Sequence, residues 1–208
     1  MIRDNREYRN MPMLAEKRAE GKEDEPSYMV EGYASTFDEY ELFKDGEDRF
    51  CERIEPTAFD GCDMSDVVFL LDHTGRVYAR TRNGSVEVGA DDHGLKCSVD
   101  LGRSSSARAV KEDIDCGNYD RMSFAFTVTE DAIEHDRETR KYLRIIKRIG
   151  KLFDISAVSF PANPNTEIGK TARSAFDGFI EEEKRLELAK AEEARALEEA
   201  KKKFMEVQ

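Results

Sequence analysis

Three residues that lie far apart in the sequence have the chemistry of a serine hydrolase: His73, Ser123 and Asp154. A serine hydroxyl becomes an effective nucleophile when an imidazole accepts its proton and a carboxylate fixes the tautomer of that imidazole. Each residue also has an ordinary explanation, as a surface hydroxyl, a capping histidine, or an aspartate in a structural salt bridge with Arg or Lys. Whether the three side chains meet depends on the strands and turns that carry them.

Ser123 lies in the stretch RMSFAFTVTE, residues 121–130, where large apolar residues alternate with small or polar ones. A period of two predicts a half-buried strand. The larger residues, expected to face the core, are Met122, Phe124, Phe126 and Val128. The opposite face, with Ser123, Ala125 and Thr127, has little bulk. This small face leaves space beside the strand for another chain segment, with Ser123 at the entrance to that space.

Two other strands are expected to carry the histidine and the aspartate. The apolar run DVVFLL, residues 66–71, predicts a strand buried on both faces, and His73 follows its end, where a general base is held on a rigid scaffold. Residues 152–160 predict the last strand. Its alternation gives one face with Leu152, Asp154, Ser156 and Val158, and another with Phe153, Ile155 and Ala157. The Asp154 carboxylate is thus expected in an apolar setting, where it needs a partner.

The rest of the domain is expected to be mostly antiparallel strands with one or two helices, an α+β fold. The expected elements are strands at 28–37, 49–54 and 142–149, an acidic loop at 38–48, a turn at Pro56, a polar hairpin tip at 131–141 and a helix at 104–116. A hairpin turn is expected at Asp91–Gly94, which makes His93 a turn residue.

Both ends of the chain differ from the middle in composition. Residues 1–26 are densely charged and expected to be flexible, apart from a segment, Tyr8–Leu14, that could form an edge strand. From about Ala175 to Gln208 the sequence predicts a solvated helix rich in Glu, Lys and Ala. Within it, residues 181–208 hold nine acidic and seven basic side chains. We expect a flexible N-terminus (1–26), one folded domain (27–170) and a charged helical tail (171–208), a scaffold-like extension that binds partners.

Composition excludes several classes of function. In a chain of 208 residues, 39% hydrophobic content is enough for one core. A net charge of −12 argues against nucleic acid as a partner, because phosphate binding needs clustered Lys and Arg. No apolar run approaches a membrane span and the first residues lack a secretory segment, so the expected location is the cytosol, with no membrane partner.

Metal and thiol chemistry have little support. The four cysteines show no C-x-x-C spacing and are expected to be free thiols, and the three histidines are too far apart for a zinc motif, so no metal or cofactor is expected. An enzyme with Cys97 or Cys116 as nucleophile is a distant third interpretation, because neither cysteine has a histidine partner visible in the sequence.

Six short motifs occur in one order along the chain: VEGYASTF (30–37), ERIEPTAF (52–59), LLDH (70–73), Gly94-Leu95, MSFAF (122–126) and DISAVSFPANP (154–164). Over roughly residues 28–168, this order resembles the prohead (procapsid maturation) serine proteases of tailed bacteriophages, whose fold is similar to the herpesvirus capsid protease, assemblin. Thr57 and Ala125 stand where that family commonly has Gly, and Asp154 stands where Glu is more usual.

The resemblance implies a β-barrel-like domain with Ser123 as nucleophile, His73 as general base and acid, and Asp154 as the orienting carboxylate. Because the herpesvirus enzymes use a second histidine as third member, His135 is an alternative; we favour Asp154, since His135 lies in a polar hairpin tip. The basic run from Arg144 to Lys151 is a candidate for the oxyanion hole. The alternative is that these side chains are solvated charges on a strand.

The implied function is cleavage of scaffold protein, major capsid protein and the chain itself, within the assembling procapsid in the cytoplasm of the host bacterium. The resemblance also leads us to expect that the chain associates with itself as a homo-oligomer. The alternative is an inactive assembly or scaffold protein that keeps the protease fold, which the changed acid at Asp154 makes conceivable.

Overall fold

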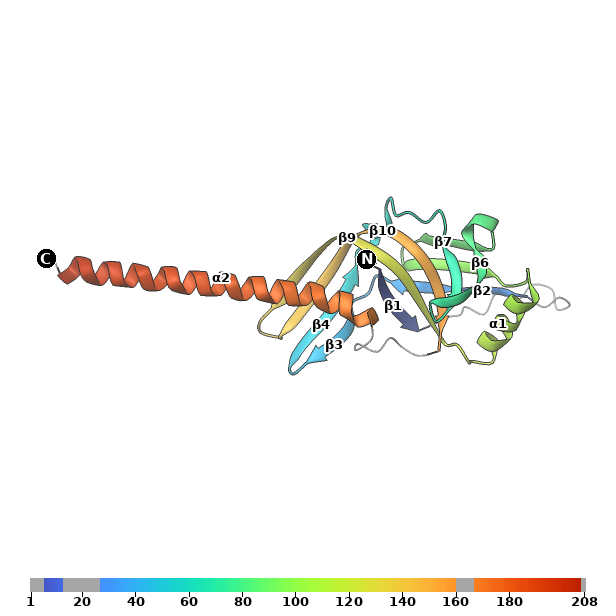
Figure 1. The fold of residues 1–208 in the computed structure, drawn as a ribbon, viewed down its shortest axis with the longest axis horizontal. Helices are drawn as coiled ribbons and strands as arrows, with labels where there is room; N and C mark the ends of the chain where they lie inside the picture. The colour runs from blue at the N-terminus through green and yellow to red at the C-terminus, as the bar shows by residue number, and fades with distance from the viewer. Residues whose placement is uncertain (1–5, 13–26, 160–166, 207–208) are drawn as a thin grey trace. The chain divides into compact units, whose positions relative to one another are not determined.

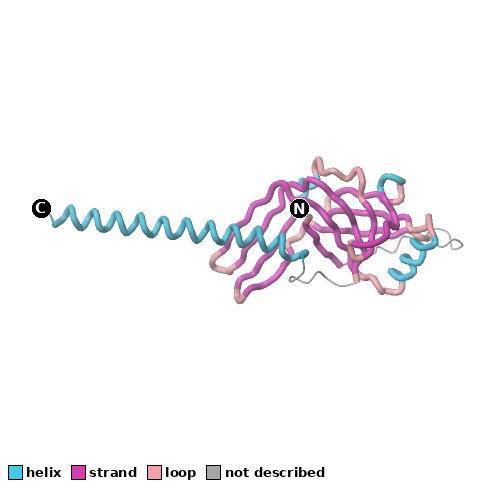
Figure 2. The backbone as a smooth tube through the Cα atoms, viewed as in Figure 1, coloured by secondary structure: helices cyan, strands magenta, loops and turns pink. Residues whose placement is uncertain are grey.

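The computed structural model of the chain describes residues 6–12, 27–159 and 167–206 (Figure 1). The chain divides into two compact units, Met1–Thr171 and Ala172–Gln208. Strands dominate the regular structure of the first unit (Figure 2), and the fold class is α+β, as expected. Residues 13–26, and the end of the motif at 154–164, lie outside the described residues.

The elements of the first unit follow in chain order. The strands are β1 (Glu7–Pro12), β2 (Met29–Thr36), β3 (Tyr40–Asp45), β4 (Asp48–Ile54), β5 (Val68–Leu71), β6 (Thr74–Arg80), β7 (Val86–Ala90), β8 (Gly94–Asp100), β9 (Arg121–Asp136) and β10 (Lys141–Val158). The described residues between these strands also form helix α1 (Ser105–Asp115) and the 3₁₀ turns Pro56–Phe59 and Thr81–Asn83.

The described strands form two sheets. The larger has the order β1-β9-β10-β4-β3, with β5 and β6 attached beside the second half of β10; the smaller has the order β2-β8-β7. Pairing is antiparallel except where β10 meets β4 and β5. Within the described residues neither sheet closes on itself, so the barrel-like part of the expectation is not confirmed.

β9 and β10 are long strands that run side by side (Figure 1). The sequence predicted a polar hairpin tip at 131–141, and the tip is there but shorter, because β9 continues to Asp136 and β10 begins at Lys141. The predicted break between 149 and 152 is wrong, because β10 runs unbroken through Gly150. A Cβ at Gly150 would lie 2.8 Å from the Thr129 Cγ2, so glycine here allows close strand approach. Register shifts on both sides of Gly150 keep the two strands paired.

Two polar segments are strands that the sequence did not predict. The acidic segment expected as a loop contains β3, which pairs with β4 across a turn at Gly46, whose φ is +62°. β6, the mostly exposed TGRVYAR, pairs with the buried strand β5. Both lie at sheet positions where one face meets solvent, so their sequences lack the apolar pattern.

The main core is built from both sheets and α1. Its strand residues include Met122, Phe124 and Phe126, the face predicted for β9, with Val128 packed at its margin. On β10 the predicted faces need a correction, because a register shift between Leu152 and Asp154 puts Leu152 in the core with Ile155 and Ala157. Asp154 and Ser156 remain together on the other face.

Turns and caps follow the sequence closely. In the β7–β8 turn, the Asp91 Oδ1 accepts hydrogen bonds from the backbone N–H groups of His93 and Gly94, so His93 is a turn residue, as predicted. A Cβ at Gly94 would lie 2.0 Å from the Ser35 carbonyl oxygen, which only glycine avoids. Helix α1 begins after Ser104, whose side chain accepts from the Ala107 N–H.

The second unit is helical. Helix α2 (Glu167–Glu206) begins earlier than the expected start near Ala175 and is 40 residues long. From residue 181 onward its described side chains are almost all exposed, as expected for a charged, solvated helix. None of the described helices combines the length and the apolar character that crossing a membrane requires.

Candidate active site

Three neighbouring strands bring the predicted residues together. Over residues 154–157, β10 lies between β9 and β5, so that Ser156 is opposite Ser123 on one side and Leu70 on the other. Leu71 of β5 pairs with Thr74 of β6, which leaves Asp72 and His73 as the two residues of a tight hairpin turn. The histidine therefore stands beside the strand that carries Asp154.

The turn that presents His73 has an unusual backbone. Asp72 has φ +46° and His73 has φ +57°, the left-handed region required at both centres of a type I′ hairpin turn, where Asn-Gly is the usual pair. Such conformations cost about 1–3 kcal/mol each when the residue is not glycine. The turn is held by Asp72, whose N–H donates to the Ala157 carbonyl at 3.0 Å and whose carboxylate accepts from the Ser159 N–H at 3.0 Å.

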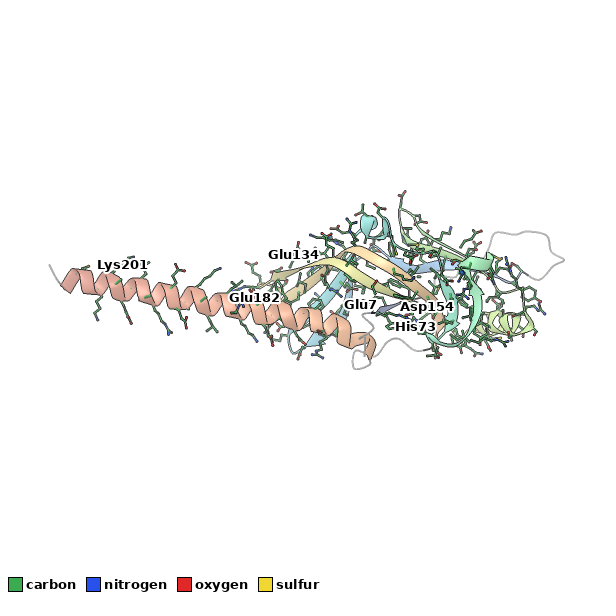
Figure 3. All side chains as sticks on the ribbon, turned by 45° about the horizontal axis from the view of Figure 1, so that its top comes forward. Glu7, His73, Glu134, Asp154, Glu182 and Lys201 are labelled. Carbon is green, nitrogen blue, oxygen red and sulfur yellow. The ribbon has the colours of Figure 1, made fainter. Side chains whose placement is uncertain are left out.

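A continuous chain of hydrogen bonds joins the three side chains. The His73 Nε2 lies 2.5 Å from the Ser123 Oγ, and the His73 Nδ1 lies 2.6 Å from the Asp154 Oδ1. Figure 3 shows His73 and Asp154 next to each other. Ser123 is fully buried and Asp154 is 4% exposed. Ser123 is thus not a surface hydroxyl, and in the described part of the chain no Arg or Lys pairs with Asp154.

A fourth residue, Ser156, belongs to the site. Its Oγ donates to the Asp154 Oδ1 at 2.8 Å and lies 3.3 Å from the His73 Nδ1. It is fully buried, so the buried Asp154 carboxylate has two hydrogen-bonding partners, His73 and Ser156. Sequence reasoning assigned no role to Ser156, although its spacing of two from Asp154 already placed both on one face of the strand.

This arrangement is suited to nucleophilic acyl transfer. The imidazole can take the proton of the Ser123 hydroxyl through Nε2, while the carboxylate on Nδ1 fixes its tautomer and stabilises the imidazolium that forms. Among the described residues, no group of three His, Cys, Asp or Glu side chains is arranged to hold a metal ion.

The alternative candidates lie elsewhere. His135 stacks on Tyr142, with ring centroids 3.9 Å apart, and is twelve residues along β9 from Ser123. Burial raises the pKa of the Cys97 thiol to about 12, so this core residue is a poor nucleophile. Cys116 is exposed at the end of α1. Asp154, not His135, contacts the His73 Nδ1.

The basic run on β10 forms ion pairs. Arg144 is buried and pairs with Glu7, Glu52 and Asp131. Lys151 pairs with Asp63 at 2.8 Å, an exposed bridge. The expectation of solvated charges therefore fails for Arg144, which belongs to a buried ionic cluster that sequence reasoning missed.

Comparison with known families supports the same chemistry. A family model described as Caudovirus prohead serine protease matches residues 14–178, most of the chain and all three residues of the hydrogen-bonded site. The chain belongs to this family. Comparison with curated proteins and with solved structures gave no match. A prohead serine protease acts in capsid maturation, so the family and the Ser–His–Asp geometry agree on the general activity.

Strand β1 lies outside the residues matched to the prohead protease family.

Proposed function

We propose that this prohead protease is a serine endopeptidase that cleaves scaffold protein and major capsid protein inside the procapsid, and also cleaves its own chain. The observation that carries the proposal is the hydrogen-bonded chain from Ser123 through His73 to Asp154. The family supports capsid proteins as substrates in general terms. Action in the host bacterial cytoplasm, a homo-oligomeric state and a barrel-like domain related to assemblin are parts of the same proposal.

The reaction would proceed through an acyl-enzyme. Ser123 Oγ attacks the carbonyl carbon of the peptide bond as His73 Nε2 takes the hydroxyl proton, and the imidazolium then gives that proton to the leaving amine. Water, deprotonated by the same imidazole, attacks the ester and releases the new carboxyl end, which restores Ser123. Asp154 accepts the Nδ1–H bond throughout, and the Ser156 hydroxyl holds one oxygen of that carboxylate.

A second candidate is a non-enzymatic assembly protein that keeps the protease fold. The full burial of Ser123 favours it, because a buried nucleophile has no access to substrate in this conformation. The intact hydrogen bonds around His73 favour the enzyme, since Ser123 and Asp154 occupy both ring nitrogens.

Incubation of the purified chain with its scaffold and major capsid proteins separates the two candidates. Ser123→Ala should lower the rate of cleavage by about 10⁴- to 10⁶-fold, because it removes the nucleophile. Ser98→Ala, on a strand of the smaller sheet, is the matched control and should cleave as the parent does. Full cleavage by a folded Ser123→Ala chain would exclude Ser123 as nucleophile, and absence of cleavage by the parent would support the assembly protein.

A further inference from the structure

The edge of the strand that carries the nucleophile is occupied by the N-terminal strand. β1 pairs antiparallel with residues 121–126 of β9 and lies at the edge of that sheet (Figure 1). In this pairing Asn10 is directly opposite Ser123. If β1 left, the backbone groups of β9 beside Ser123 would form an open edge. Extended peptides bind such edges as an added strand.

One residue of β1 reaches the catalytic histidine. Tyr8 is opposite Ala125, and its ring meets the His73 ring edge-on, with centroids 4.6 Å apart and an angle of 71° between the planes. Ser123 is fully buried in the same arrangement. With β1 in place, the edge where a peptide would lie beside Ser123 is taken.

The other face of β1 carries two buried charges of opposite sign. The Arg9 Nη2 donates to the Glu52 Oε2 at 2.6 Å and to the Glu7 Oε2 at 2.6 Å. Glu7 in turn accepts from the Arg144 Nη1 at 2.6 Å and from its Nη2 at 2.9 Å. Glu52 on β4 and Arg144 on β10 are directly opposite each other in the parallel pair. The domain thus offers one acid and one base, and β1 supplies their complements two residues apart.

The charges that β1 contacts also have partners within the domain, which would remain if β1 left. The Arg144 Nη1 lies 3.3 Å from the Glu52 Oε2, the Tyr40 hydroxyl donates to Glu52 at 2.5 Å, and Arg144 retains Asp131. Because Glu7 and Arg9 leave together as a neutral pair, neither Glu52 nor Arg144 is left as an isolated buried charge, the situation that costs most. β1 can therefore exchange with another strand that brings the same two charges.

We propose that β1 is a built-in occupant of the peptide-binding edge of β9, and that Glu52 and Arg144 select strands with an acidic and a basic residue two positions apart. The competing occupant is a substrate segment with that pattern, which lies along β9 once β1 has left. That the bound peptide is a substrate rests on the proposed protease function. The binding itself is independent of cleavage.

Peptide binding tests the exchange without catalysis. All chains carry Ser123→Ala, and the probe is a fluorescent peptide of residues 6–12, REYRNMP. The double substitution Glu7→Arg with Arg9→Glu places like charges against Arg144 and Glu52 and should release β1. Fluorescence anisotropy should then show binding at least about tenfold tighter than in the Ser123→Ala parent, since like-charge contacts cost several kcal/mol.

Two controls make the measurement specific. A peptide with the two charges exchanged, RRYENMP, should gain no affinity for the released edge. The same exchange on exposed α2 residues, Glu182→Arg with Arg185→Glu, should leave binding as in the parent. Equal binding of both peptides, or equal binding to released and parent chains, would overturn the inference.

A second variant keeps the buried charges and tests closure directly. In chains with Ser123 intact, Tyr8→Ala should increase the rate at which a fluorophosphonate labels Ser123 by about two- to tenfold, the contribution expected of one aromatic contact. Unchanged labelling would count against closure by β1, even if the double substitution proved unfoldable. Absence of labelling in every chain, with peptide binding as expected, would instead overturn the serine protease assignment and leave the edge site standing.

Discussion

Two buried polar clusters lie on opposite faces of β1, and they differ in how their charge is balanced. The first, His73, Ser123, Asp154 and Ser156, holds one carboxylate whose partners are an imidazole and a hydroxyl. The second, Glu7, Arg9, Glu52 and Arg144, holds two acids and two bases that neutralise each other. A cluster with permanent counter-charges suits strand recognition, whereas one whose counter-charge forms only during proton transfer suits catalysis.

The largest effect expected after loss of Ser123 itself is at the carboxylate of the first cluster. Asp154→Asn should lower the rate of cleavage by about 10²- to 10⁴-fold, because the amide favours the wrong tautomer of His73. The effect should fall on turnover more than on substrate binding. His135→Ala, which removes a ring stacked on Tyr142, should change the rate little. The reverse ranking in a cleavage assay on folded chains would place a second histidine in the site.

Substitution in the second cluster should lower the stability of the folded chain. Glu52→Gln removes one of the two buried carboxylates that Arg9 and Arg144 share and leaves Glu7 as the other, so one buried positive charge loses its balance. It should lower the free energy of unfolding by about 3–5 kcal/mol in urea titration. Glu41→Gln is the matched control, because its bridge to Arg49 is partly exposed and contributes about 0–1 kcal/mol. Equal losses in the two variants would show that the cluster does not behave as a buried one.

Acid should weaken the second cluster through Glu7. Burial alone would raise the pKa of this carboxyl, but Arg9 and Arg144 outweigh burial and leave the pKa below its usual value. A lowered pKa in the folded state means that Glu7 stabilises the fold above its unfolded pKa of about 4.3 and loses that contribution as pH falls through the folded value.

Unfolding in urea at pH 6 and at pH 3 measures this effect. The parent chain should lose more stability on acidification than Glu7→Gln, which has no proton to gain at this position. The groups that face Glu7 in the cluster, Arg9, Arg144 and Glu52, are the same in both chains. An equal loss would mean that Glu7 is not the titrating group.

The smallest effect is expected from the helical tail. Residues 181–208 expose almost all their described side chains, and the ion pair of Arg185 with Glu182 at 2.6 Å is local to the helix. Removing them should change the free energy of unfolding of the first unit by less than about 0.5 kcal/mol. A large fall in the thermal midpoint would contradict this, whereas reduced incorporation into procapsids would identify the tail as a recruiting element.

The first cluster was accessible from the sequence because its members lie on elements with clear local patterns. Ser123 lies in an alternating strand, His73 follows an apolar run, and Asp154 interrupts another. The family resemblance then linked the three in one order. Proximity itself came only with the structure, since nothing local shows that β5 is parallel to β10 and beside Asp154.

The second cluster could not be predicted for a physical reason. Glu7, Arg9, Glu52 and Arg144 all lie in charged stretches whose composition indicates solvent exposure. Their burial depends on contacts between side chains far apart in the sequence, such as the ion pair of Arg9 on β1 with Glu52 on β4, which no local pattern encodes. The same holds for the bulge at Leu152–Asp154, which moved Leu152 to the other face by one residue of slippage.

The position of β10 along the chain also sets when activity can arise. It is the last strand of the sheet to be synthesised, yet it is the partner of β4, β5 and β9. The contacts of β10 with β4 and β5 are distant in sequence and form slowly, because a long loop must close before they are gained. In refolding experiments, Ser123 should become reactive only in the slowest phase, after most strand content has formed. If the chain has the proposed protease activity, a nascent chain should stay inert towards its neighbours until β10 has inserted.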